Sequence, residues 1–299
     1  MEHKAGFVNI IGKPNVGKST LMNELVGERL SIITSKAQTT RHRIMGIVNG
    51  DDFQIVYSDT PGYMKPHYKL QETMMDFVEI ALTDADILLY LIDISDKEPE
   101  DETLVKKVQN AQCPVIIVIN KLDLRTQDEI TAFGKDLREK YPKAEIIAVS
   151  ALMRFNLNVI FDLIIEKLPE NPPYYDKSEL TDKPERFFAS EIIREKLFLN
   201  YKQEIPYSCE VVVNTFKEKK DKLKNDITHI QADIFVERES QKGIVIGSKG
   251  EDLKWVGTKA REDMERFFLK KVYLELIVKV KENWRDNAQQ LKQFGYKQN

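Results

Sequence analysis

Five short apolar runs recur along the first half of the chain, each separated from the next by a segment long enough for a helix. They are FVNIIG, FQIVYSD, DILLYLID, PVIIVIN and AEIIAVS. Continuous β-branched runs of this length are typical of strands buried on both faces, and the intervening segments favour parallel pairing. An NGDD turn at 49–52 joins IMGIV to FQIVYSD, so these two strands are expected to pair antiparallel. The pattern predicts a doubly wound α/β domain with a mostly parallel sheet.

A proline-containing stretch, PENPPYYDKSELTDKPE, ends this pattern. Beyond it the chain reads as a helix, two strands, a glycine loop flanked by helical segments, and a last strand, YLELIVKVKE. An α-β-β-α-α-β order predicts a smaller α+β domain with three paired strands. We place the first domain at 1–170, a linker at 171–183, the second domain at 184–285, and a short polar helix and tail without an assigned role at 286–299.

Composition adds a difference in charge between the two halves of this 299-residue chain. Residues 184–299 hold 23 Lys/Arg and 19 Asp/Glu, a formal charge of +4, which leaves 22 against 29, or −7, for residues 1–183. The basic excess is compatible with a polyanionic partner and equally with an ordinary solvated surface. The same two readings apply to the lysines of KEKKDKLK at 217–224, where we favour a solvated hairpin.

Cysteine use and the N-terminus bear on location. Cys113 and Cys209 lie far apart, which suits reduced thiols better than a disulfide framework. The first residues lack the features of a signal peptide, and no apolar run approaches the roughly 18 residues of a spanning helix. We expect a cytoplasmic, monomeric protein whose membrane contact, if any, is peripheral at the inner face of the cell membrane.

The sequence GKPNVGKST follows the first strand and opens a helix, the context in which G-x-x-x-x-G-K-[ST] forms a phosphate-binding loop. Its glycines let backbone N–H groups point at phosphate oxygens, and the helix adds the positive end of its dipole. Lys18 is expected to reach the β- and γ-phosphates, and the Ser19 hydroxyl to ligate Mg²⁺. A ligand-free strand–helix turn is the alternative. The predicted residues are Gly12, Lys13, Pro14, Asn15, Val16, Gly17, Lys18, Ser19 and Thr20.

Three further motifs end predicted strands, where α/β sheets bind ligands. In DTPG, the carboxylate can hold the Mg²⁺ shell and the glycine amide can sense the γ-phosphate. In NKLD, the carboxylate of Asp123 matches the ring N–H and exocyclic amine of guanine, a donor pair that adenine lacks, and SAL can supply an amide to the guanine oxygen. Each motif alone could be a helix cap, but their order predicts GTP or GDP as ligand. The residues are Asp59, Thr60, Pro61, Gly62, Asn120, Lys121, Asp123, Ser150, Ala151 and Leu152.

These motifs resemble the G-motifs of translation-factor-related GTPases, and QTTRH resembles the switch I motif of the Era family. In that family a switch I threonine closes over Mg²⁺ in the GTP state. Spacing does not separate Thr39 from Thr40, and we favour Thr40. The resemblance implies switch I residues Gln38, Thr39, Thr40, Arg41 and His42, metal ligands Ser19, Thr40 and Asp59, and catalytic residues Lys18, Thr40, Asp59 and Gly62.

Two positions bear on the rate of hydrolysis. Tyr63 follows DTPG where Ras-like GTPases carry a water-orienting glutamine, so slow intrinsic hydrolysis is expected. Asn15 resembles the position that helps hold K⁺ in some related GTPases, where the ion can supply positive charge. An ordinary role for Asn15 as a turn residue is the alternative.

The second glycine loop, Gly247-Ser248-Lys249-Gly250, follows the apolar segment GIVI and precedes the helix EDLKWV. A lone G-x-x-G is most often a turn between helices. In a KH domain, such a loop clamps about four nucleotides of single-stranded nucleic acid. Its setting here resembles a type II KH domain, and a KH domain behind a GTPase is the combination found in the Era family. The predicted RNA-binding residues are Ile244, Val245, Ile246, Gly247, Ser248, Lys249 and Gly250.

The resemblance covers nearly the whole chain and implies a GTP-hydrolysing switch in small (30S) ribosomal subunit assembly. It implies GTP/GDP and Mg²⁺ as ligands, and the small ribosomal subunit, through the 3′ end of its 16S ribosomal RNA, as partner. One alternative is a membrane-associated regulatory GTPase whose second domain binds protein or lipid, although no strongly basic amphipathic helix supports it. Another is a GTPase partner of an RNA-modifying enzyme.

Overall fold

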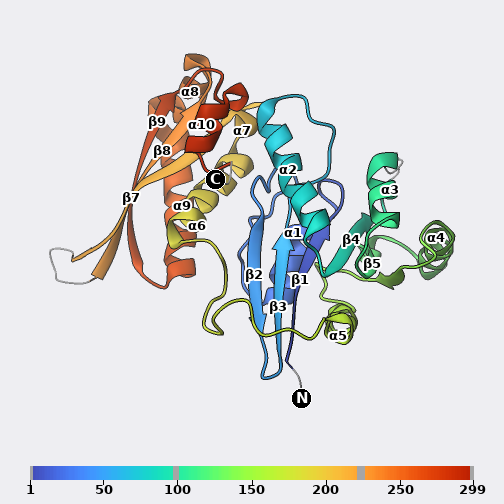
Figure 1. Ribbon diagram of the computed structural model, residues 1–299. Coiled ribbons are helices and arrows are strands. Elements are labelled where there is room, and N and C mark those ends of the chain that lie inside the picture. The colour runs from blue at the N-terminus through green and yellow to red at the C-terminus, as the bar shows by residue number, and fades with distance from the viewer. Residues whose placement is uncertain (1–2, 97–100, 221–225, 297–299) are drawn as a thin grey trace. The chain divides into compact units, whose positions relative to one another are not determined.

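The computed structural model describes residues 3–96, 101–220 and 226–296, and the chain divides into two compact units (Figure 1). Unit 1 comprises Met1–Pro66 and Met74–Asp182, and unit 2 comprises His67–Thr73 and Lys183–Asn299. Each unit has its own β-sheet. No helix within the described ranges combines the length and apolarity needed to cross a bilayer.

Unit 1 is built on a six-stranded sheet in the order β2-β3-β1-β4-β5-β6. β2 pairs antiparallel with β3 through the predicted NGDD turn, and all other neighbours are parallel, which confirms the predicted doubly wound sheet. Parallel pairing brings the carboxyl ends of β1, β3, β4 and β5 to one edge. The strands are β1 (Lys4–Ile11), β2 (Ile44–Asn49), β3 (Phe53–Asp59), β4 (Ile87–Asp93), β5 (Val115–Asn120) and β6 (Glu145–Ala148).

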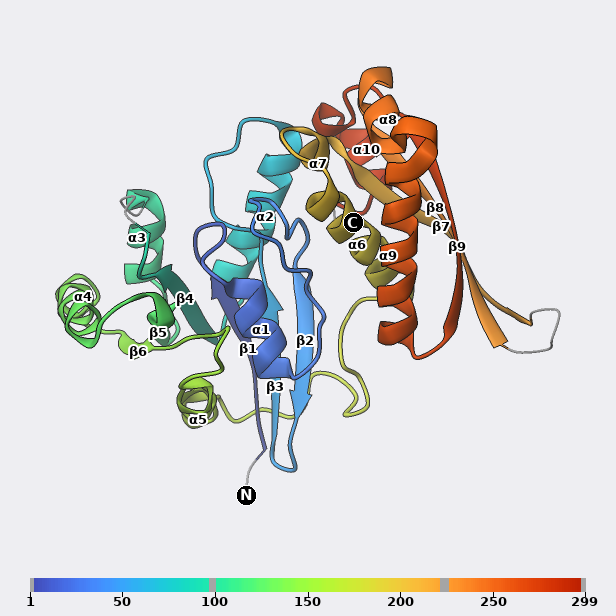
Figure 2. The ribbon, with the colours of Figure 1, turned by 180° about the vertical axis from the view of Figure 1, so that it is seen from behind.

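Helices cover both faces of this sheet (Figure 2). The central strands are buried on both sides, as their continuous apolar runs predict; every residue of β4 is buried. Val78, Leu104 and Leu137, from three successive helices, pack in one cluster with β4 and β5. The helices of the fold's first half are α1 (Lys18–Val26), α2 (Lys69–Thr83), α3 (Glu102–Gln109), α4 (Gln127–Lys140) and α5 (Leu157–Lys167).

The segment predicted as a linker, 171–183, runs along the outer strands of unit 1 for most of its length. The backbone N–H of Ile47 donates to the Leu180 carbonyl at 2.8 Å, and Gln54 Nε2 donates to the Tyr175 carbonyl at 2.9 Å. These bonds satisfy polar groups on the edge strand β2 and on buried Gln54. Proline spacing gave no sign of this attachment.

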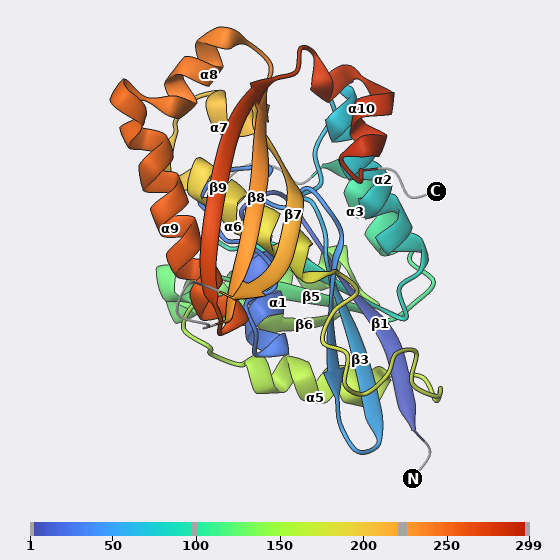
Figure 3. The same ribbon diagram turned by 90° about the vertical axis from the view of Figure 1, so that its left-hand side faces the viewer.

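Unit 2 is a three-stranded sheet, β7-β8-β9, with β8 antiparallel to β7 and parallel to β9. α6 and α9 pack against one face of the sheet (Figure 3). The predicted α-β-β-α-α-β order is present, with the short helix α7 inserted between α6 and β7. The elements are α6 (Glu185–Asn200), α7 (Ile205–Ser208), β7 (Glu210–Lys220), β8 (Asp226–Val236), α8 (Glu239–Ile246), α9 (Glu251–Phe268) and β9 (Lys271–Val280).

Two predictions concern the ends of this unit. Lys217–Lys220 is exposed, as expected for a solvated hairpin, and the rest of KEKKDKLK lies outside the described residues. The C-terminal segment, predicted as a polar helix and tail, forms η3 (Trp284–Asp286) and α10 (Ala288–Gln293). Trp284 and Tyr296 are almost fully buried, so part of this segment belongs to the core.

Candidate functional site

The first glycine loop connects β1 to α1 in a conformation that two of its glycines make possible. Gly12 and Gly17 have φ of 151° and 98°, which L side chains rarely adopt. A Cβ on Gly12 would lie 2.4 Å from the Leu91 carbonyl oxygen, and one on Gly17 would lie 2.3 Å from Asn120 Nδ2. The backbone therefore passes too close to β4 and β5 for any other residue at these positions.

Lys18 begins α1 and folds back over this loop. Its Nζ donates to the Lys13 carbonyl at 2.7 Å and to the Gly12 carbonyl at 3.1 Å. Burial lowers the pKa of Lys18 to about 8, against the opposing effect of the Asp59 carboxylate. A buried ammonium held by its own loop is suited to a negatively charged ligand, because phosphate oxygens would supply the charge that its surroundings lack.

Three oxygen-bearing side chains predicted as metal ligands meet beside Lys18. Ser19 Oγ donates to Asp59 Oδ2 at 2.6 Å, and Thr40 Oγ1 lies 3.0 Å from Ser19 Oγ and 3.3 Å from Asp59 Oδ2. Asp59 Oδ1 is buried and has no hydrogen-bond partner among the described residues. Burial raises the pKa of Asp59. Hydroxyl and carboxylate oxygens with an unsatisfied acceptor fit Mg²⁺, which prefers oxygen ligands.

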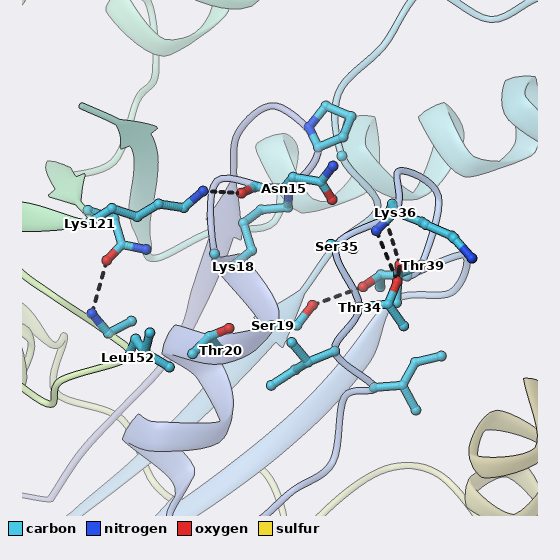
Figure 4. Close-up of a pocket in the computed structure, with 18 of the residues that line it drawn as sticks. Asn15, Lys18, Ser19, Thr20, Thr34, Ser35, Lys36, Thr39, Lys121 and Leu152 are labelled. Carbon is cyan, nitrogen blue, oxygen red and sulfur yellow. Dashed lines mark hydrogen bonds between the residues drawn. The ribbon is translucent and has the colours of Figure 1, made fainter. Parts of the chain in front are cut away.

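The structure distinguishes Thr39 from Thr40, the two switch I threonines, which the spacing of the motif could not do. Thr39 Oγ1 donates to the Lys36 carbonyl at 2.7 Å and lies 2.6 Å from Thr34 Oγ1, within its own loop (Figure 4). Only Thr40 of the two is joined to Ser19 and Asp59 in the described part of the chain. The geometry therefore favours Thr40 as the metal-ligating threonine.

The DTPG segment lies against the phosphate loop. Thr60 Oγ1 donates to the Ile10 carbonyl at 2.7 Å, and the Tyr63 N–H donates to the Gly12 carbonyl at 3.0 Å. A Cβ on Gly62 would lie 2.6 Å from Pro14 Cα. Pro61 and Gly62 are both buried. This close approach brings the Gly62 backbone directly against the phosphate loop.

NKLD and SAL are bonded to one another and to the phosphate loop. Asn120 Nδ2 donates to the Val16 carbonyl at 2.9 Å, and Asn120 Oδ1 accepts from the Ala151 N–H at 3.0 Å. Ser150 Oγ donates to Asp123 Oδ1 at 2.5 Å. The Ala151 amide thus holds Asn120, and the Ser150 N–H donates to the Phe155 carbonyl at 3.3 Å, so two of the SAL amides are already bonded within the protein.

Lys121 connects the same two regions from the other side. Its Nζ donates to the Asn15 carbonyl at 2.9 Å (Figure 4). The same Nζ donates to Asp93 Oδ2 at 2.6 Å. Both Lys121 and Asn15 adopt the left-handed backbone conformation, with φ of 66° and 63°. This confirms that Asn15 serves as a turn residue at least.

A cavity of about 530 Å³ joins these motifs. Some of the predicted residues lie outside its lining: Gly12, Lys13, Val16, Arg41, His42, Asp59 and Pro61. Of these, Arg41 is fully buried, and the His42 ring lies 6.1 Å from that of Phe77. The lining also includes residues that the sequence reasoning missed: five lie between α1 and QTTRH, where no motif marks them, and Leu124 follows NKLD. The predicted residues that line it are Pro14, Asn15, Gly17, Lys18, Ser19, Thr20, Gln38, Thr39, Thr40, Thr60, Gly62, Asn120, Lys121, Asp123, Ser150, Ala151 and Leu152, and those missed are Ile32, Ile33, Thr34, Ser35, Lys36 and Leu124.

The second glycine loop joins α8 to α9 through η2 (Ser248–Gly250). Gly247, Lys249 and Gly250 have φ of 73°, 50° and 80°. A Cβ on Gly247 would lie 2.2 Å from Asp252 Oδ2, whereas one on Gly250 would meet nothing within 4 Å. Ser248 and Lys249 are exposed at the tip.

The GIVI segment forms the end of α8 and is divided between surface and core. Ile244 is 50% exposed, and Ile246 is partly buried. Val245 is fully buried, and its carbonyl accepts from Tyr201 Oη at 2.6 Å. The prediction that Val245 contacts RNA is therefore wrong for its side chain, because helical periodicity turns this position into the interior of unit 2.

Comparison with known proteins agrees with this geometry. Residues 7–121 match the family described as 50S ribosome-binding GTPase, and residues 204–285 match the KH domain family. GTPase Era of Clostridium kluyveri is 44% identical over 98% of this chain and 99% of its own length. GTPase Era of Thermoanaerobacter sp. is 41% identical over 99% of this chain and 97% of its own. The chain belongs to the Era GTPase family.

Solved structures of Era superimpose on the whole chain. A crystal structure of Era in complex with MgGDPNP and nucleotides 1506–1542 of 16S ribosomal RNA has a TM-score of 0.92 and 38% identity, and covers 99% of this chain and 100% of the other. A structure of a variant Era from Aquifex aeolicus bound to GDP·AlF4⁻ matches with the same values. The predicted architecture, a P-loop GTPase domain followed by a KH domain, is confirmed, and this Era family member is a GTPase.

Proposed function

We propose that this Era family GTPase is a GTP-controlled RNA clamp in small ribosomal subunit assembly, which binds the 3′ end of 16S ribosomal RNA through its KH domain. The observation that carries the proposal is the joining of Ser19, Thr40 and Asp59 beside Lys18 in a chain that also contains an exposed G-x-x-G loop. The related Era bound to MgGDPNP and 16S nucleotides supports the choice of ligands.

Each residue of the first site has a role in this proposal. Lys18 and the loop amides would bind the β- and γ-phosphates, while Ser19, Thr40 and Asp59 would hold Mg²⁺, which supplies charge neutralisation of the phosphates. Asp123 would accept from guanine. Because Thr40 and Gly62 belong to segments that approach the γ-phosphate position, loss of that phosphate would release them and change the state of the switch.

The second loop would hold RNA by its backbone. Glycines at 247 and 250 leave no side chain between the loop backbone and a sugar-phosphate chain, and Lys249 would meet a phosphate. Exposed Ile244 would contact a base edge or face from the adjoining helix. The hydrolysis of GTP would then serve as a release step.

The test is binding of full-length protein to short single-stranded RNAs, one copied from the 3′ end of 16S ribosomal RNA, with a GTP analogue or GDP. Tight, sequence-selective binding that is lost in Gly250→Asp, where a Cβ would meet nothing within 4 Å, supports the proposal. Unchanged nucleotide binding and thermal unfolding in this variant are the controls for folding. Equal, weak binding by native and variant protein would overturn it.

Location and ion dependence complete the proposal. Cys113 and Cys209 lie in separate units, which suits reduced thiols and supports a cytoplasmic location. Liposome flotation of the full chain tests peripheral membrane contact. We also propose that K⁺ assists hydrolysis through Asn15. Asn15→Gly keeps the left-handed turn but removes the amide, so it should abolish faster hydrolysis in K⁺ than in Na⁺ while preserving GDP affinity. Equal rates of native protein in both salts would contradict this role.

A further inference from the structure

A buried arginine stands between switch I and the sheet. Arg43 lies three residues after Thr40 and immediately before β2, and only 6% of its surface is exposed. Its Nη1 donates to Asp84 Oδ2 at 2.6 Å, and its Nη2 to Asp84 Oδ1 at 3.1 Å. The pair is bidentate, the geometry in which a guanidinium fixes both distance and orientation.

The remaining donors of Arg43 reach two neighbouring strands. Nε donates to Ser58 Oγ on β3 at 2.6 Å, and Nη2 donates to Asn9 Oδ1 on β1 at 3.0 Å. Asn9 in turn donates to Asp84 Oδ1 at 2.7 Å and to the Ala81 carbonyl of α2 at 2.7 Å. The acceptors thus hold one another as well as the arginine.

Each partner lies next to part of the nucleotide site. Ser58 directly precedes Asp59, and Asn9 lies on the strand that leads into the phosphate loop. Asp84 directly follows α2, the helix that comes after DTPG. The Arg43 side chain therefore connects three parts of the molecule: the end of switch I, the strand that carries Asp59, and the end of α2, the helix that comes after DTPG.

We propose that Arg43 is a positioning residue that holds Thr40 in register with Asp59 and anchors both nucleotide-sensing segments to the sheet. The inference rests on the proposed switch. Thr40 would contribute to the metal site only with a γ-phosphate bound, so a loosened Arg43 should weaken binding of a GTP analogue more than binding of GDP. If Arg43 served only to stabilise the fold, its replacement would weaken the binding of both nucleotides equally or of neither.

Two variants test the network in the full-length protein. Arg43→Lys keeps the charge but cannot form the bidentate pair. Asp84→Asn keeps the size of a residue whose side chain is 43% exposed, and turns one acceptor into a donor facing the guanidinium. The readout is the ratio of GTP-analogue to GDP affinity at saturating Mg²⁺, together with the Mg²⁺ concentration that half-saturates analogue binding.

Gln54→Met is the matched control. Gln54 is a fully buried polar residue on β3, four positions before Ser58, and its side chain bonds the backbone of Tyr174 and Tyr175. Its replacement removes buried hydrogen bonds from the same unit without touching the switch segments. Thermal unfolding of all variants shows how much each is destabilised.

Arg43→Lys and Asp84→Asn are each expected to lower the affinity ratio about tenfold, the effect of roughly one charge-assisted hydrogen bond, and to require more Mg²⁺. Gln54→Met should leave the ratio unchanged. An unchanged ratio in both network variants, or an equal fall in Gln54→Met, would overturn the inference while the proposed switch stands. If native protein showed no preference for the GTP analogue, the result would instead contradict the proposed switch itself.

Discussion

At the residue scale, we predict that recognition of guanine depends on a single carboxylate, that of Asp123. Asp123 lines the cavity and is held by Ser150 Oγ at 2.5 Å. Asp123→Asn places a donor against the two donors of guanine, so GDP affinity should fall by about 10²–10³-fold, as when polar groups of a buried site lose their partners. Isothermal titration with GDP measures the loss.

The same variant should gain a ligand. Xanthine has an oxygen where guanine has its exocyclic amine, and an asparagine amide can donate to that oxygen. Xanthosine diphosphate is therefore expected to bind Asp123→Asn more tightly than it binds native protein. Ser150→Ala, which frees the carboxylate without changing its chemistry, should weaken GDP binding only slightly; GDP binding by Asp123→Asn at native strength would refute the assignment of Asp123.

Sequence identified the residues of this site by motif, yet it could not identify how they are held. Thr39 and Thr40 are adjacent and chemically equal, so only the path of the loop distinguishes them. Arg43 belongs to no motif, and its partners lie between 15 and 41 positions away in the chain. Side-chain networks of this kind depend on how α2 packs against the sheet. Hydrophobic periodicity predicts which face of the helix is buried, but not which residues of the sheet that face contacts.

At the scale of elements, substitutions in the turn between α8 and α9 can distinguish the effect of a negative charge on RNA binding from the effect of side-chain size. Gly250 has φ of 80° and open space where a Cβ would be placed. Asparagine tolerates this backbone conformation better than most residues, and aspartate has nearly the same size. Gly250→Asp should therefore reduce RNA affinity more than Gly250→Asn, by about tenfold, because only the carboxylate repels phosphate.

Fluorescence anisotropy with a labelled single-stranded RNA measures both variants, and the salt dependence adds a second criterion. The difference between Gly250→Asp and Gly250→Asn should shrink as ionic strength rises, since it is electrostatic. Equal affinities at low salt would show that no phosphate approaches the loop at this point.

The C-terminal elements close the core of unit 2. Trp284 Nε1 donates to the Ser208 carbonyl at 2.9 Å, and its ring lies 5.5 Å from that of Phe294. Tyr296 Oη donates to Glu210 Oε2 at 2.5 Å. Trp284→Ala should lower the free energy of unfolding by about 3–5 kcal/mol, the usual cost of removing a buried aromatic residue.

Denaturant unfolding of the full-length protein, with hydrogen exchange of β7 as a local probe, measures this effect. Tyr296→Phe removes a hydroxyl but keeps the ring, so it should cost only about 1–3 kcal/mol. A Trp284→Ala protein with native stability and unchanged protection of β7 would show that the segment is an appendage, as its polar composition indicates.

Elements with regular periodicity were predictable, and those fixed by distant contacts were not. The sheet of unit 1 follows from apolar runs at strand length, and the antiparallel β2–β3 pair from a turn motif. WRDNAQQLKQFGYKQN is mostly polar, and Trp284 and Tyr296 become part of the core because Ser208 and Glu210 receive their polar atoms. Local pattern carries no information about such partners.

At the scale of the whole molecule, the proposed function places two sites for different polyanions in one chain. The phosphate loop belongs to unit 1 and the G-x-x-G loop to unit 2, and the formal charges of the two halves of the sequence are opposite in sign. If the nucleotide controls RNA binding, the two equilibria share a coupling free energy. That quantity can be measured from either side.

The coupling must be reciprocal. If replacing GDP by a GTP analogue tightens RNA binding by a given factor, saturating RNA must raise the preference for the analogue over GDP by the same factor, typically 5–150-fold. Anisotropy titrations with RNA at fixed nucleotide, and nucleotide titrations at fixed RNA, supply the two numbers. Thr40→Ala should bring both factors close to one while leaving RNA affinity in the GDP state intact, because it removes the proposed switch I metal ligand and leaves the G-x-x-G loop unchanged. If Thr40→Ala retained the full coupling, the signal would leave the nucleotide site through DTPG alone. If native protein bound RNA with the same affinity in both nucleotide states, hydrolysis would control a different partner.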